Sequence, residues 1–260
     1  MVAYAVHRAT AAEIPALRKA PGSLGDSAIA PSLLRHADEQ TVVGLAAILR
    51  AVARGGLEPG DFAAWAVLAA PRFLGRAMFE AAFPQFLAEG AWGVSPHLVP
   101  AHSLHSPSGA FSQALKAHGP NLGVGGTPGG EREAMLAAAT LLDSGSVAGI
   151  WVVVSGRSGG RDGAVAIETP GDYEALALAL VPAKADHGGP RLLVSPDALQ
   201  LDPKAGSEAD RATIAGWLGA DPGGSRRVDG GHAAGSTIPA PHFRPAPARA
   251  GIARGDRGHS

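Results

Sequence analysis

The sequence predicts an α/β protein with a thiolase-like layered fold, in which a mixed sheet carries a buried central helix. Residues 62–70 are apolar without a break between Asp61 and Pro71, which is typical of a strand covered on both faces. Residues 131–142 form a helical segment that is apolar nearly all round, as expected of a helix without a wet face. Helical and extended segments alternate along the chain, and that rhythm favours layered α/β architecture.

The first part of the chain contains one well-marked helix. Apolar residues between positions 42 and 52 recur at helical spacing. Asp38 is placed to cap the start of this helix, and Gly55-Gly56 is placed to end it. Three shorter segments precede it: a strand at residues 2–6, a helix at 11–19, and a Gly-, Pro- and Ser-rich connection at 21–31.

The middle of the chain is less regular. Residues 73–87 have helical character, and Pro84 is expected to break that helix because proline removes a backbone donor. Residues 95–107 are rich in Pro, Ser and His and are expected to be irregular. The remaining predicted elements are a helix at 108–117 and strands at 150–154, 173–181 and 191–194.

The composition changes after residue 206. Residues 1–206 hold the predicted strands and long helices, and we expect them to form one domain. A weak helix at 209–218 is followed by residues 221–260, which have almost no large apolar side chains. Such a segment buries too little surface to offset its ordering entropy. The sequence therefore predicts that residues 207–260 are a weak helix and a disordered tail.

Residue counts exclude several classes of function. The chain has 0 Cys, so it has no disulfide, no thiolate metal site and no thiol nucleophile. Its 22 basic and 23 acidic residues give a formal net charge of -1, which offers nothing to attract nucleic acid. No run reaches the roughly 18 apolar residues of a membrane span, and residues 1–10 lack the pattern of a signal peptide. A cytoplasmic protein without a membrane segment is expected.

A Gly-rich turn before the predicted central helix carries the most specific motif. The residues that carry the motif are Pro96, Pro100, His105-Ser106, Gly109, Ser112-Gln113, Gly119-Pro120-Asn121-Leu122 and Val124. They are followed by the turn, the Ala-rich helix and the strand from Trp151. This arrangement resembles the N-terminal half of the β-ketoacyl synthases. The resemblance extends over roughly residues 34–194, with Arg35 and Asp38 ahead of the first long helix and the alternating segment 174–180 as a later strand.

The resemblance implies an acyl-accepting cysteine on this turn, and the matching position is Pro128. Thr127, Pro128 and Gly129 stand in the region where the family has Thr-Ala-Cys-Ser-Ser or a similar motif. Neither catalytic histidine motif of the family's C-terminal half is present, so no catalytic role carries over to any residue. Thr127, Pro128 and Gly129 stay as candidates for acyl-pocket or turn roles. His105, beside the acyl pocket that the resemblance implies, is a further candidate.

Two alternative sites have simpler structural explanations. Read from Gly123 as a dinucleotide motif, the turn has Pro128 where the third glycine should be, and a Walker lysine is missing. His97, His102 and His105 have spacing compatible with a metal, but no acidic or cysteine partner lies nearby in the sequence. No cofactor and no metal are therefore predicted.

Two segments that contain arginine could bind a partner, but a simpler role in contact with solvent is favoured for each. The loop at residues 155–161 holds two arginines that could meet the phosphate of a carrier protein, but a solvated loop is favoured. The basic residues of the tail could touch acidic partners, but a solubilising role is favoured.

These observations favour a non-catalytic, β-ketoacyl-synthase-like subunit in fatty-acid or polyketide biosynthesis. Its expected partner is a ketosynthase-type subunit in a homo- or hetero-oligomer, or an acyl carrier protein, because a half-fold would leave apolar surface exposed. The resemblance implies that the contact runs through the strand at 150–154. The alternative is a module that binds acyl-CoA or an acyl carrier without catalysis. A third reading is an enzyme that uses Thr127 or Ser108 as nucleophile, although neither has an evident base.

Overall fold

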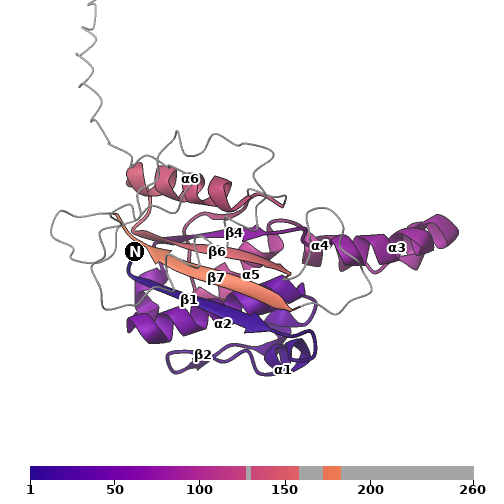
Figure 1. Ribbon diagram of the computed structural model, residues 1–260, viewed down its shortest axis with the longest axis horizontal. Coiled ribbons are helices and arrows are strands. Elements are labelled where there is room, and N and C mark those ends of the chain that lie inside the picture. Colours follow the sequence, from indigo (N-terminus) through magenta and orange to yellow (C-terminus); the bar gives the residue numbers. More distant parts are fainter. Residues whose placement is uncertain (127–129, 158–171, 183–260) are drawn as a thin grey trace, which may run out of the picture.

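A sheet with helices on both faces forms the body of the molecule. The computed structural model describes residues 1–126, 130–157 and 172–182, and Figure 1 shows the three layers. Helices α2 (Glu39–Gly55) and α5 (Ser106–Leu115) cover one face, and α6 (Gly130–Asp143) covers the other. The strand predicted at 191–194, the helix predicted at 209–218 and the predicted tail lie outside the described residues.

The sheet is mixed, as the sequence predicts. Its strand order is β1-β7-β6-β4-β5. Strands β5, β4 and β6 run parallel to one another, and β7 runs antiparallel to both β6 and β1. The strand bounds are β1 (Ala3–Ala9), β4 (Trp65–Pro71), β5 (Asn121–Gly123), β6 (Gly149–Arg157) and β7 (Tyr173–Leu180). The α/β class predicted from the sequence is confirmed.

Strand β4 starts later than predicted because Phe62, although buried, lies before the strand. Phe62 ends the short 3-10 helix η2 (Pro59–Phe62) and is fully buried. Its ring packs edge-on against Trp65, with centroids 5.2 Å apart, and against Trp151 at 5.6 Å. An apolar residue beside a strand therefore extended the apparent strand pattern without belonging to the ladder.

The contact with a partner subunit that was predicted at residues 150–154 cannot be a pairing of strands. These residues lie in β6, which pairs with β4 on one side and with β7 on the other. Its backbone donors and acceptors are already used, so β6 has none left to pair with another chain. In the described part of the chain, the outer strands of this sheet are β1 and β5.

Helix α2 begins and ends where the sequence predicts. The Asp38 side chain accepts a hydrogen bond from the backbone N–H of Gln40 at 2.9 Å, and Gly56 adopts the left-handed conformation that ends the helix. Gly44 lets the helix lie close to its neighbours, because a Cβ there would stand 2.5 Å from the Phe111 ring. This close packing makes the α2 side of the sheet the larger part of the core.

The connection predicted at residues 21–31 contains a small hairpin. Helix α1 (Ile14–Lys19) is followed by β2 (Ser23–Leu24) and β3 (Ser27–Ala28), which pair antiparallel. The 3-10 helix η1 (Pro31–Leu34) then leads toward α2. The sequence suggested only a linker because each strand is too short to show an alternating pattern.

Helix α3 (Arg76–Glu89) runs through Pro84, so the predicted break does not occur. Proline removes the one backbone bond that its N–H would make to Glu80, but the flanking residues keep helical geometry. The helix leads into the 3-10 helix η3 (Gly90–Gly93), and α4 (Leu98–His102) lies within the segment predicted to be irregular. Figure 1 shows α3 projecting away from the layered body.

Helix α6 is buried on one side only, which corrects the expectation of a helix buried all round. Ala134, Met135 and Ala138 pack against the sheet, whereas Leu136 is 44% exposed. The sequence is apolar on both sides of the helix, but within residues 1–126, 130–157 and 172–182 only the sheet side is covered. Among the described residues, no helix is both long and apolar enough to cross a membrane.

Candidate functional site

The Gly-rich turn before α6 lies at the edge where the parallel strands end. Strands β4, β5 and β6 point the same way, so their carboxyl ends meet at one edge of the sheet. This edge is where open α/β sheets commonly place their sites. Gly126 forms a parallel bridge with Arg72, and its carbonyl accepts a hydrogen bond from Phe73 N–H at 3.1 Å. The end of β4 therefore holds the start of the turn.

The backbone at the two ends of the turn, Gly125 and Gly130, lies in close contact. A Cβ on Gly125, whose φ is +79°, would stand 2.6 Å from the Cα of Gly130, the first residue of α6. Only glycines allow so close a backbone approach. The predicted connection from the turn directly into this helix is thereby confirmed. Thr127, Pro128 and Gly129 lie outside the described residues.

A buried ion pair stands beside this turn. The Arg72 Nε lies 3.3 Å from Oε1 of Glu131, and the two side chains are 7% and 1% exposed. Glu131 is in the first turn of α6, where a carboxylate suits the positive end of the helix dipole. The pair ties the start of α6 to the end of β4 and places charge where the surroundings are otherwise apolar.

Gln40 fixes the backbone of Arg72 from the opposite face of the sheet. Its side-chain Nε2 donates to the Arg72 carbonyl at 2.8 Å, and its Oε1 accepts from the Arg72 N–H at 3.2 Å. The Ser155 hydroxyl also donates to Oε1 of Gln40, at 3.2 Å. All three residues are buried, so α2, β4 and β6 are joined by one polar network at this edge.

Asp38 and His102 form a second buried contact near the same edge. The His102 Nε2 lies 4.0 Å from Oδ2 of Asp38, and its Nδ1 lies 3.0 Å from the Leu98 carbonyl. Burial raises the pKa of the Asp38 carboxyl, and the neighbouring Glu39 adds to that rise, while hydrogen bonds from Gln40 and Gly75 and the charge of His102 oppose it. The contact joins α4 to the cap of α2.

The backbone of His105 lies close to β5, and its ring is on the surface. A Cβ on Gly123 in β5 would stand 1.9 Å from the Leu104 carbonyl oxygen and 2.8 Å from the His105 nitrogen. The backbone at His105 therefore touches the strand that leads into the turn. Its exposed ring has Nδ1 3.4 Å from the Ser108 hydroxyl.

Ser108 does not have the geometry of an activated nucleophile. Its hydroxyl donates to the His105 carbonyl at 2.9 Å, which uses its proton in a helix-start contact. The side chain is fully buried, so a substrate has no access to the oxygen. These contacts give Ser108 a structural role at the start of α5.

The three histidines considered as metal ligands do not converge. His97 stacks on His36 with ring centroids 4.4 Å apart and an angle of 4° between the planes, while His102 turns toward Asp38. Within the described residues, no group of three or more His, Asp or Glu side chains could hold a metal ion.

Sequence reasoning missed the polar network of Gln40, Arg72 and Ser155. A usable signal was present, because Arg72 and Ser155 each follow a buried apolar run at the carboxyl end of a parallel strand. From the sequence, Glu131 indicates only a favourable negative charge at the start of a helix. Its partner could not be identified, because the pairing depends on where β4 ends relative to α6.

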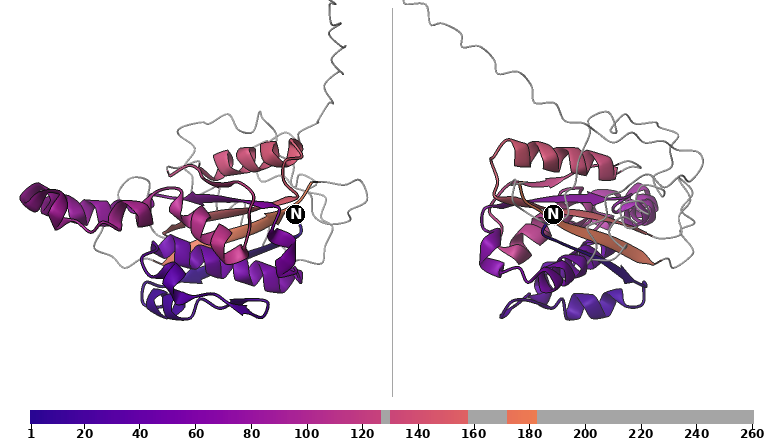
Figure 2. Two further views of the ribbon diagram at one scale, coloured as in Figure 1. Left: turned by 180° about the vertical axis from the view of Figure 1, so that it is seen from behind. Right: turned by 60° about the vertical axis from the view of Figure 1, so that its left-hand side comes forward.

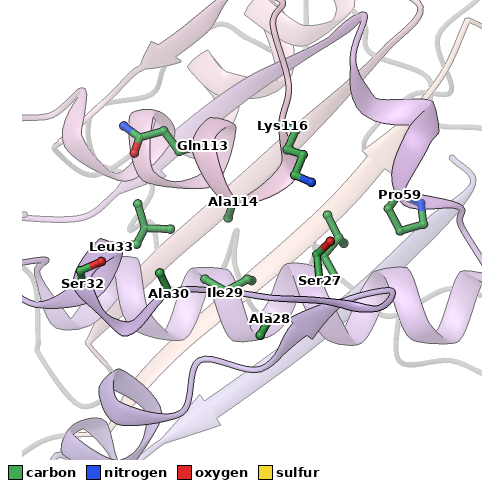
Figure 3. A pocket seen from close by; sticks show the side chains of 11 residues that line it. Ser27, Ala28, Ile29, Ala30, Ser32, Leu33, Pro59, Gln113, Ala114 and Lys116 are labelled. Atoms are coloured by element: carbon green, nitrogen blue, oxygen red, sulfur yellow. The ribbon is translucent and has the colours of Figure 1, made fainter.

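A groove of about 440 Å³ lies on a different part of the surface, and Figure 3 shows it. It runs between the β2–β3 hairpin and the far end of α5. Its lining combines apolar side chains with a few polar ones: Leu24, Ile29, Leu33, Pro59 and Ala114, with Gln113 and Lys116 at the helix end. Helix α5 starts near the turn and ends at this groove, so the two are separated by roughly the 15 Å length of that helix.

The fold is a three-layer α/β arrangement, and the solved structures to which it is similar include ketosynthases. One is described as a type II PKS acyl-carrier protein in complex with its ketosynthase bound to the hexaketide (15% identity, 68% of this chain and 62% of that chain, TM-score 0.44). Another is the ishigamide ketosynthase/chain length factor (17% identity, 69% and 61%, TM-score 0.46). A third is a β-ketoacyl synthase from Burkholderia phymatum STM815 (14% identity, 70% and 59%, TM-score 0.48).

The chain covers 59% to 62% of the length of those three structures, so it matches only part of each. No model of a protein family matches the chain, and no curated protein sequence matches it. Because the structural similarity is distant, the function proposed below rests on the chain's own residues.

Proposed function

We propose that the chain is a non-catalytic, cytoplasmic partner subunit of a ketosynthase-type enzyme in fatty-acid or polyketide biosynthesis. The observation that carries this proposal is the absence of cysteine from the whole sequence. The resemblance matches Pro128 to the position of the β-ketoacyl synthases' nucleophile. Condensing chemistry of this kind requires a thiolate to take the acyl chain. A proline offers no nucleophilic atom and no backbone N–H to stabilise an acyl oxyanion.

The buried charges at the same edge support a structural role for the turn. Glu131 places a carboxylate in the first turn of α6, where developing negative charge on an acyl oxygen would be repelled. Arg72 pairs with that carboxylate, so its charge is already engaged. At the edge of the sheet where acyl transfer would take place, the two buried charges are thus engaged with each other in an ion pair.

Exposed apolar surface supports the need for a partner. Leu122 on the outer strand β5 is 40% exposed, and Leu136 on the outer side of α6 is 44% exposed. An outer strand also presents backbone groups that a second chain can pair with. We propose that a ketosynthase-type subunit covers this side, and that an acyl carrier protein is the further partner of the assembled pair.

Intact-mass spectrometry tests the absence of catalysis. We expect the purified chain to stay unmodified when it is incubated with acyl-carrier thioesters. Pro128→Cys is expected to accept the acyl group faster than Pro120→Cys, a matched cysteine on the other side of β5, because the turn leads into the start of a helix. A covalent adduct on the unaltered chain would refute the inactive-subunit proposal.

Co-purification with a complete ketosynthase-type subunit tests the partner role. A stable complex is the expected result, and a chain that stays monomeric in its presence contradicts it. The apolar groove beside Lys116 favours one alternative, a module that binds acyl-CoA or an acyl carrier without catalysis. Binding of acyl-CoA by the isolated chain, lost in Lys116→Ala and in an apolar-lining variant such as Leu33→Asp, would favour that alternative.

A further inference from the structure

Among the residues that the structure describes, one helical projection carries most of the exposed aromatic surface. We call residues 76–93, which comprise α3 and η3, the arm. Figure 2 shows the arm extending from the body in its left-hand view. Its exposed rings are Phe79 at 39%, Phe83 at 60%, Phe86 at 48% and Trp92 at 100%. Aromatic rings left in water at this density usually mark a contact with another molecule.

The three phenylalanines lie on one side of α3. Phe79, Phe83 and Phe86 are spaced i, i+4 and i+7, which places them within one stripe along the helix. This spacing is that of helices that dock into apolar grooves of a partner protein. With Trp92, the rings expose roughly 500 Å² of apolar surface. A standard interface buries about 800 Å² on each partner, so the arm would supply the larger part of one side.

Contacts with α4 fix the root of the arm to the body of the molecule. Gly75 caps α3 with φ +68°, and a Cβ there would stand 2.5 Å from the Cβ of His102. The Phe79 ring meets His102 edge-on with centroids 6.4 Å apart, and Arg76 pairs with Glu80 at 2.8 Å. A helix that is already formed and anchored loses little entropy when it docks.

The charges on the arm argue against a membrane surface as its occupant. Helices that lie on membranes carry several Lys or Arg residues on their polar side. The arm has one basic residue, Arg76, and it is paired with Glu80, while Glu89 adds a further negative charge. Anionic lipid would be repelled, so an apolar groove on a protein is the better match.

We propose that the arm docks its Phe79, Phe83 and Phe86 stripe into an apolar groove of the ketosynthase-type partner subunit. This inference rests on the proposed function, which supplies the identity of the partner. The arm belongs to the chain segment that leaves the sheet at β4 and returns to it at β5. Helix α5 of that connection packs against β5. A subunit bound at the outer edge of β5 would therefore lie beside the connection, and the docked arm would extend that contact.

A charge-matched pair of double variants tests the proposal in the full chain. Phe83→Glu with Phe86→Glu puts two carboxylates in the stripe, and Ala81→Glu with Gln85→Glu puts two on the opposite, exposed side of α3. All four residues are exposed, so both variants should keep the thermal midpoint of the unaltered chain. We expect the stripe variant to bind the ketosynthase-type subunit at least about 100-fold more weakly, and the control to bind within a few fold of the unaltered chain.

Each other outcome overturns a defined part of the proposal. If the unaltered chain and the stripe variant bind the ketosynthase-type subunit equally, the arm is not the docking element and the proposed function stands. If the unaltered chain does not bind it, both proposals fail. If the stripe variant only abolishes self-association, the occupant is a second copy. If it only abolishes sedimentation with vesicles of phosphatidylcholine and phosphatidylglycerol, the occupant is a membrane.

Discussion

The two faces of the sheet are packed to very different depths. Helix α2 buries ten of its 17 residues against one face, whereas α6 buries five of its 14 against the other. The fully buried rings of Phe62, Phe111 and Trp151 all lie on the α2 face. On the α6 face, the fully buried core side chains of the described residues include no aromatic ring. One face is thus complete within the chain, and the other has an outer side that a further layer could cover.

The difference separates residues that stabilise the chain from residues available for contact. Side chains on the α2 face are enclosed by the protein itself, so their burial contributes to the free energy of unfolding. Leu136 and the arm contribute little there because they stay in water. The predictions that follow test this division, beginning with the largest expected effect.

The strongest single attachment of α6 is expected to be the Arg72–Glu131 ion pair. Glu131→Gln leaves the buried guanidinium without its counter-charge, and we expect a loss of about 3–5 kcal/mol in the free energy of unfolding. Arg72→Met with Glu131→Leu removes both charges and should recover most of that loss. Urea unfolding of the three variants measures this cycle. A Glu131→Gln protein as stable as the unaltered chain would contradict it.

Cutting a cavity on the α2 face should also be costly. Ile48 is fully buried in α2, and we expect Ile48→Ala to lower the free energy of unfolding by about 2–5 kcal/mol. Denaturant unfolding gives the value. Gly60→Ala is a suitable control because a Cβ at Gly60 meets no atom within 4 Å, so it should be close to neutral.

Asp38 should give the α2 face a dependence on pH. Burial raises its pKa above the 3.8 of the unfolded chain, so the folded state holds its proton to higher pH. The free energy of unfolding therefore falls as pH rises from 3.8 through the raised value. Asp38→Asn keeps a capping oxygen but does not titrate, so its stability relative to the unaltered chain should grow across that range. Asp38→Ala, which removes the cap, is the control.

Measuring these variants from pH 4 to 8 shows whether Asp38 is responsible. A difference between Asp38→Asn and the unaltered chain that stays constant with pH would exclude a raised pKa as its cause. A difference that shrinks as pH rises would indicate a lowered pKa instead.

The smallest effect on stability is expected at the outer side of α6. Leu136→Ala should change the free energy of unfolding by less than about 0.5 kcal/mol, because the side chain is half in water. The same substitution should weaken the complex with a ketosynthase-type subunit if that side is covered there. Calorimetric titration of the complex measures the second effect. A large loss of stability in the isolated chain would mean that α6 is enclosed on both sides.

Much of the fold could be predicted because its signals are local. The cap at Asp38, the stop at Gly56 and the apolar runs of β4 and β6 depend on residues close together in the sequence. The strand limits shifted where a buried loop residue, Phe62, continued an apolar run. The break expected at Pro84 failed because one missing hydrogen bond is a small local cost against a formed helix.

The candidate site was predicted only in outline. The apolar helix after the Gly-rich turn was predicted, and it begins at Gly130. The roles proposed for Thr127, Pro128, Gly129 and His105 stay predictions. The polar network was not predicted, because Gln40, Arg72 and Ser155 come from three separate elements and meet only at the edge of the sheet. A single side chain gives no indication of a partner that is distant in the chain.

The sequence by itself determined that the chain has no thiol, that its helices and strands alternate, and that a Gly-rich turn leads into an apolar helix. Each of these follows from residue chemistry or from short-range periodicity. The tertiary structure decided that β6 lies inside the sheet, that Glu131 pairs with Arg72, and that one side of α6 and the arm stay exposed. Strand order and layer coverage depend on contacts between distant residues, and local patterns do not encode those contacts.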